Sequence, residues 1–467
     1  MLRIFNHYIP VATLALLLVE LLVIGVSIYV VEYMPWRDLG VIGMHQLLPP
    51  IFPKAAFIAV VMVTVMAACG LYQSDFVGGI REIAVRLFIA FTAAGVLMTL
   101  LVYWLEAMRF GAREMFWSIS VAMLAVALIR LLFFKWTNIG VFKPRVLVLG
   151  TGSRAVKVDE VAQQRFGGGN LDIVGYMPPL AAAPHAVAAS RILPQEDSLV
   201  EAVQRYGINE IVIAIRDRRG GNLPVHELLE CRMMGVRVLE LSTFFERECG
   251  QVKLDSLNAS WMVFNEGFNQ SASRDVVKRA FDLLSSLLLL LITSPVMLLT
   301  ALAIKLEDGG PVLYSQERVG QNDAVFTIFK FRSMRVDSEK DGKPRWALTN
   351  DDRITRVGRI IRKLRIDELP QVLNVLKGDM SFVGPRPERP YFVQKLESEI
   401  PYYSVRHCMK PGITGWAQVR YAYGATVDDA IEKLQYDLYY VKNHSLFLDV
   451  LILIETIQVV LWGKGAR

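Results

Sequence analysis

Four long apolar stretches occupy the first third of this 467-residue chain and constrain its fold more than any other feature. They cover residues 11–31, 55–71, 87–104 and 116–134. Each is close to the ~20 residues that an α-helix needs to cross a hydrocarbon core ~30 Å thick. The first stretch lacks a small-residue cleavage site and three similar stretches follow it, so it is not a removable signal. The sequence predicts a bundle of four membrane-spanning helices within residues 1–140.

The composition supports membrane insertion and excludes several other classes of protein. Hydrophobic residues make up 53% of the sequence, and a mean hydropathy of +0.36 is too high for soluble domains alone. Lys and Arg (51) exceed Asp and Glu (45) only slightly, so the charge of +6 requires no nucleic-acid partner. The four cysteines form no C-x-x-C pair, so we expect neither a disulfide framework nor a cysteine-rich zinc site.

Basic residues near the apolar stretches predict the orientation of the bundle. Seven lie before the first stretch, between the second and third, and at or after the end of the fourth, against four in the two other loops, so the contrast is modest. Because cytoplasmic loops are enriched in Lys and Arg, both ends of the bundle are expected in the cytoplasm. Everything after residue 145 should then be cytosolic.

Residues 141–265 are predicted to form a Rossmann-like α/β module. The apolar run 146–150 predicts a buried strand, and it leads into Gly150-Thr151-Gly152-Ser153-Arg154-Ala155, a G-x-G-x-x-A turn. Further strands at 172–176, 210–215 and 236–241 alternate with helical segments, which predicts a parallel sheet covered by helices. Backbone N–H groups at such a turn can approach a phosphate, so Gly150 and Gly152 are candidate nucleotide-binding residues.

The ligand of this module is left open by the sequence. The second strand ends at Tyr176 and Met177 without the acidic residue that would hold a ribose hydroxyl. The module also lacks a Tyr-x-x-x-Lys pair suited to hydride chemistry. The alternatives are a bound dinucleotide and a spacer, dimerisation or regulatory role.

Residues 283–305 form a fifth apolar segment, interrupted by Ser294-Pro295. Pro295 lacks a backbone N–H and clashes with the carbonyl four residues earlier, so the helix should bend there. The Ser294 hydroxyl can satisfy the freed carbonyl. Charged residues at both ends favour a re-entrant helix that dips into one leaflet and returns. The alternative is a kinked span, which would place residues 306–467 outside the cell.

Cations precede a pair of acids in the last third of the chain. Lys330 and Arg332 alternate along an extended segment, and a run without acids from Arg353 to Ile366 includes Arg362. The run ends in Asp367-Glu368, a plausible site for Mg²⁺ and a pyrophosphate, because Mg²⁺ is commonly held by one or two carboxylates and substrate phosphates. A carboxylate can also attack phosphorus and form a covalent intermediate. Taken alone, these charges also fit a solvated surface or one that rests on anionic lipid.

A stiff loop after the acid pair strengthens the functional interpretation. Gly384-Pro385-Arg386-Pro387 holds Arg386 between two prolines. A planar guanidinium fixed in this way suits bidentate recognition of phosphate.

The segment from about residue 278 to residue 467 resembles the bacterial sugar transferase domain of monotopic phosphoglycosyl transferases. The matching motifs are Lys278/Arg279/Asp282, Ser294-Pro295, Gln316-Glu317-Arg318-Val319-Gly320, Lys330-Phe331-Arg332-Ser333-Met334, Asp367-Glu368-Leu369-Pro370-Gln371, Gly384-Pro385-Arg386-Pro387 and Pro411-Gly412-Ile413-Thr414-Gly415-Trp416. With the four spans and the α/β module, the whole chain resembles the large members of this class. These are polyprenyl-phosphate hexose-1-phosphate transferases that start exopolysaccharide, capsule or O-antigen assembly.

The resemblance implies a fold and a location. Residues 266–467 would form a mostly α-helical monotopic catalytic domain with a re-entrant helix at 283–305. The domain would lie on the cytoplasmic face of the bacterial inner membrane, in contact with the lipid bilayer, and the protein is expected to be a homodimer.

The resemblance also implies an activity and residue roles. A hexose-1-phosphate would move from a UDP-sugar to undecaprenyl phosphate, with release of UMP. Asp367 matches the nucleophile that forms a phosphosugar-aspartyl intermediate, and Glu368 matches its partner in holding Mg²⁺. The residues expected to bind phosphate or substrate are Lys330, Arg332, Arg362, Arg386 and Asp437.

Two alternative functions belong to other classes. A membrane-anchored, NAD-dependent sugar-nucleotide dehydratase or epimerase would need a second Rossmann fold with Tyr-x-x-x-Lys, which this chain replaces by the acid pair. A non-catalytic scaffold is disfavoured by the intact Asp367, Glu368 and Arg386. The apolar segment 446–457 contains Asp449 and Glu455, so we expect an interfacial or packed helix there and not a further span.

Overall fold

The computed structural model divides into two compact units. One comprises Met1–Leu2 and Tyr8–Cys249, and the other comprises Arg3–His7 and Gly250–Arg467. The predicted domain boundaries after residues 140 and 265 fall outside the described residues. The structure describes residues 1–37, 51–73, 80–104, 112–138, 143–166, 171–179, 185–194, 198–216, 222–256, 272–336, 353–421, 424 and 426–462.

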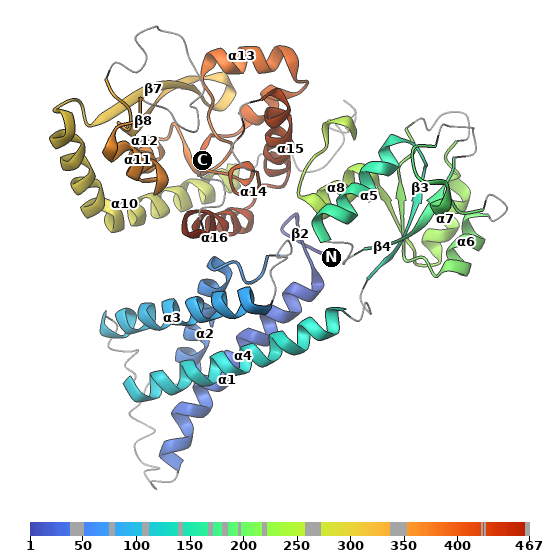
Figure 1. The fold of residues 1–467 in the computed structure, drawn as a ribbon, viewed down its shortest axis with the longest axis horizontal. Coiled ribbons are helices and arrows are strands. Elements are labelled where there is room, and N and C mark those ends of the chain that lie inside the picture. The colour runs from blue at the N-terminus through green and yellow to red at the C-terminus, as the bar shows by residue number, and fades with distance from the viewer. Residues whose placement is uncertain are drawn as a thin grey trace. The chain divides into compact units, whose positions relative to one another are not determined.

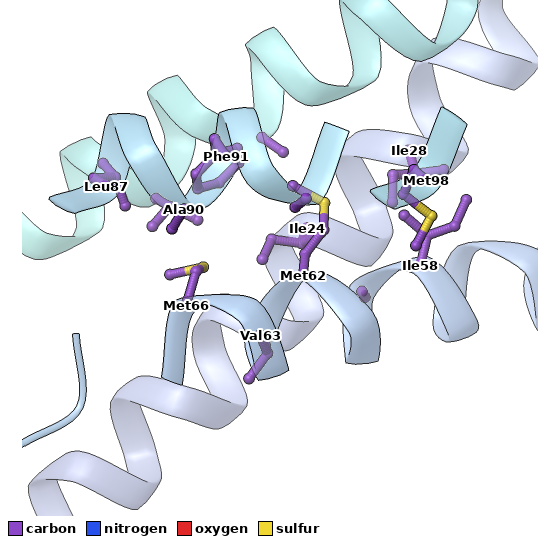
Figure 2. Packing of buried hydrophobic residues seen from close by; sticks show 14 of the residues in the cluster. Ile24, Ile28, Ile58, Met62, Val63, Met66, Leu87, Ala90, Phe91 and Met98 are labelled. Atoms are coloured by element: carbon purple, nitrogen blue, oxygen red, sulfur yellow. The ribbon is translucent and has the colours of Figure 1, made fainter. Parts of the chain in front are cut away.

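Helices form at all four of the predicted apolar stretches in the first unit. They are α1 (Val11–Arg37), α2 (Ile51–Ala68), α3 (Ile80–Trp104) and α4 (Ala112–Asn138), and a two-stranded sheet of β1 (Leu2–Ile4) and β2 (His7–Ile9) precedes them. Ile24, Met62 and Phe91 belong to a buried cluster between these helices, shown in Figure 2. Leucines such as Leu22 and Leu124 remain exposed on the outside, as expected of a bundle whose surroundings are apolar.

The second helix begins and ends earlier than the sequence predicts. The predicted span runs to Leu71, but α2 ends at Ala68 because Gly70 adopts a φ of 81°. The N–H of Gly70 donates to the carbonyl of Ala67, and that of Leu71 donates to Met66, which closes the helix in a Schellman motif. Among the described residues, four helical segments are long and apolar enough to cross a membrane: Val11–Val31, Arg81–Leu101, Arg113–Phe133 and Ser273–Asp308.

A four-stranded parallel sheet with the order β4-β3-β5-β6 follows the helices, as the alternating pattern predicts. Alternate residues of a strand face opposite sides of a sheet. Val146 and Val148 accordingly face a core with Phe244, while Leu147 and Leu149 face a second core with Leu228. Helices α5 and α8 thus cover one face, and α6 and α7 cover the other (Figure 1). The bounds are β3 (Arg145–Leu149), α5 (Ser153–Phe166), β4 (Asp172–Met177), α6 (Leu199–Tyr206), β5 (Glu210–Ile213), α7 (Val225–Met233), β6 (Arg237–Glu240) and α8 (Leu241–Cys249).

The long helix α10 (Ala272–Asp308) opens the described helices of the second unit, and Pro295 lies inside it. Figure 1 shows that α10 bends part-way along its length. The hydroxyl of Ser294 donates to the carbonyl of Leu291 over 3.1 Å, which is the carbonyl that Pro295 leaves without its helical N–H donor. Most leucines of α10 are exposed, so this helix presents an apolar surface over most of its length.

The remainder of the second unit is mostly helical, with two small sheets. An antiparallel hairpin joins β7 and β8, and a parallel pair joins β9 and β10. Trp416, Leu438 and Tyr440 lie in its main core, together with Val252. The bounds are β7 (Leu313–Val319), β8 (Val325–Phe331), α11 (Arg356–Lys363), α12 (Val372–Lys377), β9 (Ser381–Val383), α13 (Pro390–Glu399), β10 (Gly412–Thr414), α14 (Trp416–Arg420), α15 (Val427–Asn443) and α16 (Leu446–Trp462), with 3₁₀ turns at Gln321–Asp323, Ile366–Gln371 and Tyr403–Cys408.

Candidate active site

The acid pair lies on the 3₁₀ turn Ile366–Gln371, directly after the cationic helix α11. Helix α11 begins at the N-cap Thr355, whose side chain accepts the N–H of Gly358, and it ends at Lys363. Arg365 then adopts a left-handed φ of 59° and turns the chain into the 3₁₀ segment. This sharp turn places two adjacent carboxylates beside the cations of α11 and β8.

Glu368 is buried and held by cations from two different segments. Its Oε1 lies 2.6 Å from Nη2 of Arg386 and 3.1 Å from Nζ of Lys330. Burial alone would disfavour the charged carboxylate, but Arg386 and Lys330 outweigh it and hold the pKa of Glu368 well below its usual range. Burial in turn lowers the pKa of Lys330, while Glu368 opposes that shift. Glu368 is therefore a permanent anion that fixes two phosphate-binding candidates.

Asp367 differs sharply from its neighbour. Its Oδ1 is buried and has no hydrogen-bond partner among the described residues. Burial and the adjacent Glu368 charge raise the pKa of Asp367 to about 6, against the opposing charges of Lys330, Arg362 and Arg365. A buried carboxylate oxygen without a partner is costly for the fold, and such groups are candidates for chemistry. At neutral pH this carboxylate is mostly ionised and available as a nucleophile.

The loop that carries Arg386 is fixed by close backbone packing. Gly384 and Gly412 approach so closely that a Cβ on Gly384 would lie 2.4 Å from the carbonyl oxygen of Lys410, and a Cβ on Gly412 would lie 2.1 Å from the nitrogen of Gly384. The Gly384 N–H donates to Thr414, and the Gly412 N–H donates to the carbonyl of Pro385. The parallel pair β9–β10 thus holds the backbone that places Arg386 beside Glu368.

A cavity of about 210 Å³ opens beside Glu368 and Arg386. Its apolar lining includes Leu289 from α10 and Val459 and Val460 from α16. The polar lining comprises, among others, Arg365, Glu368, Arg386, Glu388, Arg406, Lys433 and Asp437. A molecule with a charged head and an apolar tail would find both kinds of surface here.

Asp437 reaches the Arg386 loop through a second arginine. Its Oδ2 lies 2.8 Å from Nη2 of Arg406, and the same nitrogen donates to the carbonyl of Arg386 over 2.8 Å. Burial raises the pKa of Asp437 to about 6 although Arg406 opposes the shift. Asp437 therefore lines the cavity and, through Arg406, holds the backbone of Arg386.

The acid pair suits a small hard cation. Mg²⁺ prefers carboxylate oxygens, and the unpartnered Oδ1 of Asp367 beside the Glu368 carboxylate offers that donor set. Asp323, Glu397 and His407 form a second possible metal-binding group among the described residues. There, Nδ1 of His407 is already satisfied by Asp323 at 2.6 Å, so we interpret this group as a structural contact.

Comparison with known proteins identifies the family. A profile described as bacterial sugar transferase matches residues 273–463. The exopolysaccharide production protein PSS of Rhizobium leguminosarum bv. phaseoli is 45% identical over 196 residues, which are 41% of this chain and 98% of that protein. This chain belongs to the bacterial sugar transferase family.

Other relatives extend the similarity beyond the family's shared domain. UDP-glucose:undecaprenyl-phosphate glucose-1-phosphate transferase of Xanthomonas campestris pv. campestris is 33% identical over 345 residues, covering 70% of this chain and 68% of the relative. UDP-N-acetylgalactosamine-undecaprenyl-phosphate N-acetylgalactosaminephosphotransferase of Aeromonas hydrophila is 47% identical over 240 residues. That match covers 51% of this chain and 56% of the Aeromonas protein, so the similarity spans about half of each.

Within this sugar transferase, the structure brings most of the predicted residues together. Lys330 and Arg386 contact Glu368, and the positive charge of Arg362 opposes the rise in the pKa of Asp367. Arg332 is placed differently from the prediction. Its guanidinium is buried, pairs with Asp308 at the end of α10 and donates to the carbonyl of Pro311 over 2.7 Å. The contacts therefore indicate that Arg332 ties α10 to β8 and give it no place beside the acid pair.

The predicted nucleotide turn lies in the other unit, where its Thr151 contacts residues 185 and 186 of the chain itself. The N–H of Ala186 donates to the carbonyl of Thr151 over 2.7 Å, and Nδ1 of His185 lies 2.9 Å from the Thr151 hydroxyl. Gly150 has a φ of 129°, and a Cβ there would lie 3.0 Å from the backbone of Ala214. Gly150 therefore serves close packing of two strand ends, and no nucleotide contact follows from the described geometry.

Sequence reasoning missed several residues of the cavity, notably Arg406, Lys433 and Glu388. Glu388 directly follows Pro387, so extending the Gly384–Pro387 motif by one residue would have found it. Arg406 and Lys433 belong to no motif, and their positions become visible only when the Tyr403–Cys408 turn packs against α15.

Proposed function

We propose that this protein transfers a hexose-1-phosphate from a UDP-sugar to undecaprenyl phosphate and releases UMP. The observation that carries the proposal is the division of labour in the acid pair: Lys330 and Arg386 neutralise Glu368, while Asp367 keeps a buried oxygen without a partner. The relatives from Xanthomonas and Aeromonas bear names that describe transfers of this type. The product would start the assembly of an exopolysaccharide, capsule or O-antigen.

In the first step, an ionised oxygen of Asp367 attacks the phosphorus that carries the sugar. A bond forms between this oxygen and phosphorus, and the bond between phosphorus and the bridging oxygen breaks. UMP leaves with the bridging oxygen and its electron pair, and an aspartyl phosphosugar remains. Arg386 and Lys330 lie where they can stabilise the charge that gathers on the phosphates.

In the second step, a phosphate oxygen of the lipid attacks the same phosphorus. The bond between phosphorus and Asp367 breaks, so the carboxylate is regenerated and a polyprenyl diphosphate sugar is formed. Glu368 does not react; it keeps Arg386 and Lys330 in place throughout. Mg²⁺ held by Asp367 and Glu368 would supply additional positive charge to the phosphate oxygens.

The lipid substrate requires a site at the membrane surface. The apolar exterior of α10, its bend and the Ser294–Leu291 hydrogen bond support a re-entrant helix that keeps both of its ends on the cytoplasmic side. The apolar lining residues Leu289, Val459 and Val460 would then contact the lipid tail. The charged lining residues would receive its phosphate.

The test is a transfer assay with the full chain in membranes that contain undecaprenyl phosphate. A panel of UDP-hexoses is screened for UMP release and for formation of the lipid-linked sugar diphosphate. We expect at least one UDP-hexose to yield both products in equal amounts. UMP release without a lipid product, or no reaction across the panel, would contradict the proposal.

A further inference from the structure

The carbonyl of Val383, the last residue of β9, receives an unusual number of hydrogen bonds. The Lys278 ammonium donates to it over 3.2 Å, the Ser381 hydroxyl over 2.9 Å and the Tyr440 hydroxyl over 3.0 Å. Lys278 has three hydrogens to donate, whereas the Ser381 and Tyr440 hydroxyls have one each and share it between this carbonyl and a buried aspartate. Arg386 lies three residues farther along the chain, at the end of the same rigid connection.

Two of these donors are themselves held by a buried aspartate of α16. Nζ of Lys278 lies 2.9 Å from Oδ2 of Asp449 and 3.1 Å from Oδ1 of Asp282. The Tyr440 hydroxyl lies 2.7 Å from Oδ1 of Asp449 and 3.0 Å from the Val383 carbonyl oxygen, so its single hydrogen is shared between these two acceptors. Asp449 thus contacts both Lys278 and Tyr440, and each of these side chains lies within hydrogen-bond distance of the Val383 carbonyl oxygen.

Asp282 also forms hydrogen bonds with the two residues of β9 that precede Val383. Oδ1 of Asp282 accepts the N–H of Phe382 over 3.1 Å and the hydroxyl of Ser381 over 3.1 Å. Asp282, Asp449 and Tyr440 are almost completely buried. Hydrogen bonds in such surroundings are expensive to leave unmade, so the register of β9 is tightly fixed.

This arrangement links three helices to the loop of Arg386. Lys278 and Asp282 come from the start of α10, Tyr440 from α15 and Asp449 from α16. None of these four side chains has a described contact with Glu368 or lines the cavity. They can influence the site only through the backbone of residues 383–385, which leads to Arg386.

We propose that Tyr440 and Asp449 are positioning residues that, together with Lys278, fix β9 so that the Arg386 guanidinium faces Glu368 and the substrate phosphates. This inference rests on the proposed function, because it assigns Arg386 to phosphate binding. It predicts that losing the Tyr440 hydroxyl impairs transfer only through Arg386.

The experiment is a double-mutant cycle in the full chain. Tyr440→Phe should lower kcat/KM about 10-fold in the wild-type background and less than about 2-fold in an Arg386→Lys background. Asp449→Asn, which preserves side-chain volume, should show the same dependence on Arg386. Equal losses in both backgrounds, or no loss in the wild type, would overturn the proposal.

A neighbouring tyrosine provides the matched control. Tyr439 is also buried on α15, and its hydroxyl lies 2.8 Å from Nδ1 of His7. Tyr439→Phe removes the same atom and should lower the melting temperature comparably while changing kcat/KM less than about 2-fold. A loss of kcat/KM equal to that of Tyr440→Phe would show a general effect on stability and would overturn the positioning role.

Binding of inorganic pyrophosphate separates this inference from the proposed function. By titration calorimetry, Tyr440→Phe should weaken pyrophosphate binding several-fold, and Tyr439→Phe should not. If the wild type catalyses no transfer but this difference persists, the proposed function fails and the positioning role stands. If transfer occurs but the two variants bind pyrophosphate equally, the positioning role fails alone.

Discussion

Two glycine-containing turns follow parallel strands in this protein, and they serve opposite purposes. Gly150-Thr151-Gly152 follows β3, and Gly384-Pro385-Arg386 follows β9. In both, a glycine permits close approach to a neighbouring backbone, at Ala214 in the first case and at Lys410 in the second. The first turn is bonded to the chain's own Ala186, whereas the second presents a guanidinium to a buried carboxylate and a cavity.

The difference shows that a glycine turn alone does not identify a functional site. Glycine permits a backbone conformation or a close contact, and many folds need this for packing. The chemistry depends on the charged side chain that the turn carries and on the groups opposite it. Arg386 meets Glu368 and Lys330, whereas the Gly150 turn has no comparable cluster of charges among its described contacts.

The largest expected effect in this comparison comes from removing the proposed nucleophile, Asp367. Asp367→Asn keeps the shape of the side chain but cannot form the phosphosugar adduct, so UMP release should fall by more than about 10³-fold. Asp275→Asn makes the same chemical change at an exposed position on α10 and should leave the rate unchanged. The measurement is UMP release per enzyme, and near-normal turnover of Asp367→Asn would exclude this residue as nucleophile.

Replacing the arginine of the functional turn should have the next largest effect. Arg386→Lys keeps the positive charge but loses the planar fork, so kcat/KM should fall by about 100-fold. The measurement is the initial rate over a range of UDP-sugar concentrations. Full activity of the lysine variant would show that charge alone suffices at this position.

The pH profile tests the raised pKa of Asp367. Because this pKa is about 6, the nucleophile is protonated below pH 6 and ionised above it. The rate should be nearly flat above pH 7 and fall about 10-fold between pH 7 and pH 5. Asp437 also has a pKa of about 6, so Asp437→Asn is the control. If the acid limb disappears in Asp437→Asn, Asp437 and not Asp367 sets it.

The smallest effect is expected at the turn of the α/β module. A Cβ on Gly152 meets nothing within 4 Å, so Gly152→Ala should change transfer less than about 2-fold. Gly384→Ala is its counterpart in the functional turn, where the new Cβ clashes with the Lys410 carbonyl, and it should reduce both activity and melting temperature. Comparable losses in the two alanine variants would contradict the distinction between the turns.

Much of the fold could be predicted from hydrophobic periodicity. The four helices, the parallel sheet and the break at Ser294-Pro295 all follow from local patterns of apolar and turn residues. The end of α2 could not, because Gly70 stops the helix within an apolar stretch that continues to Leu71. Val252 and Gly250, which precede the boundary predicted after residue 265, form hydrogen bonds with Gln435 and Trp416 of the second unit.

The site was predictable only where its residues form motifs. Asp367, Glu368 and Arg386 stand in short runs with a chemical signature, and the structure brings them together. Arg332 directly follows β8, and the alternation of Lys330 and Arg332 in the sequence does not reveal that Arg332 pairs with Asp308. Arg406, Lys433 and Asp449 act through tertiary contacts between segments far apart in the sequence, which no local pattern records.

The most direct test of the central claim is the mass of the protein after incubation with a UDP-sugar in the absence of undecaprenyl phosphate. The account predicts an added mass of one hexose phosphate on a peptide containing Asp367, which disappears when the lipid phosphate is supplied. An unmodified Asp367 in a preparation that releases UMP and forms lipid product, or an adduct on another residue, would contradict the account.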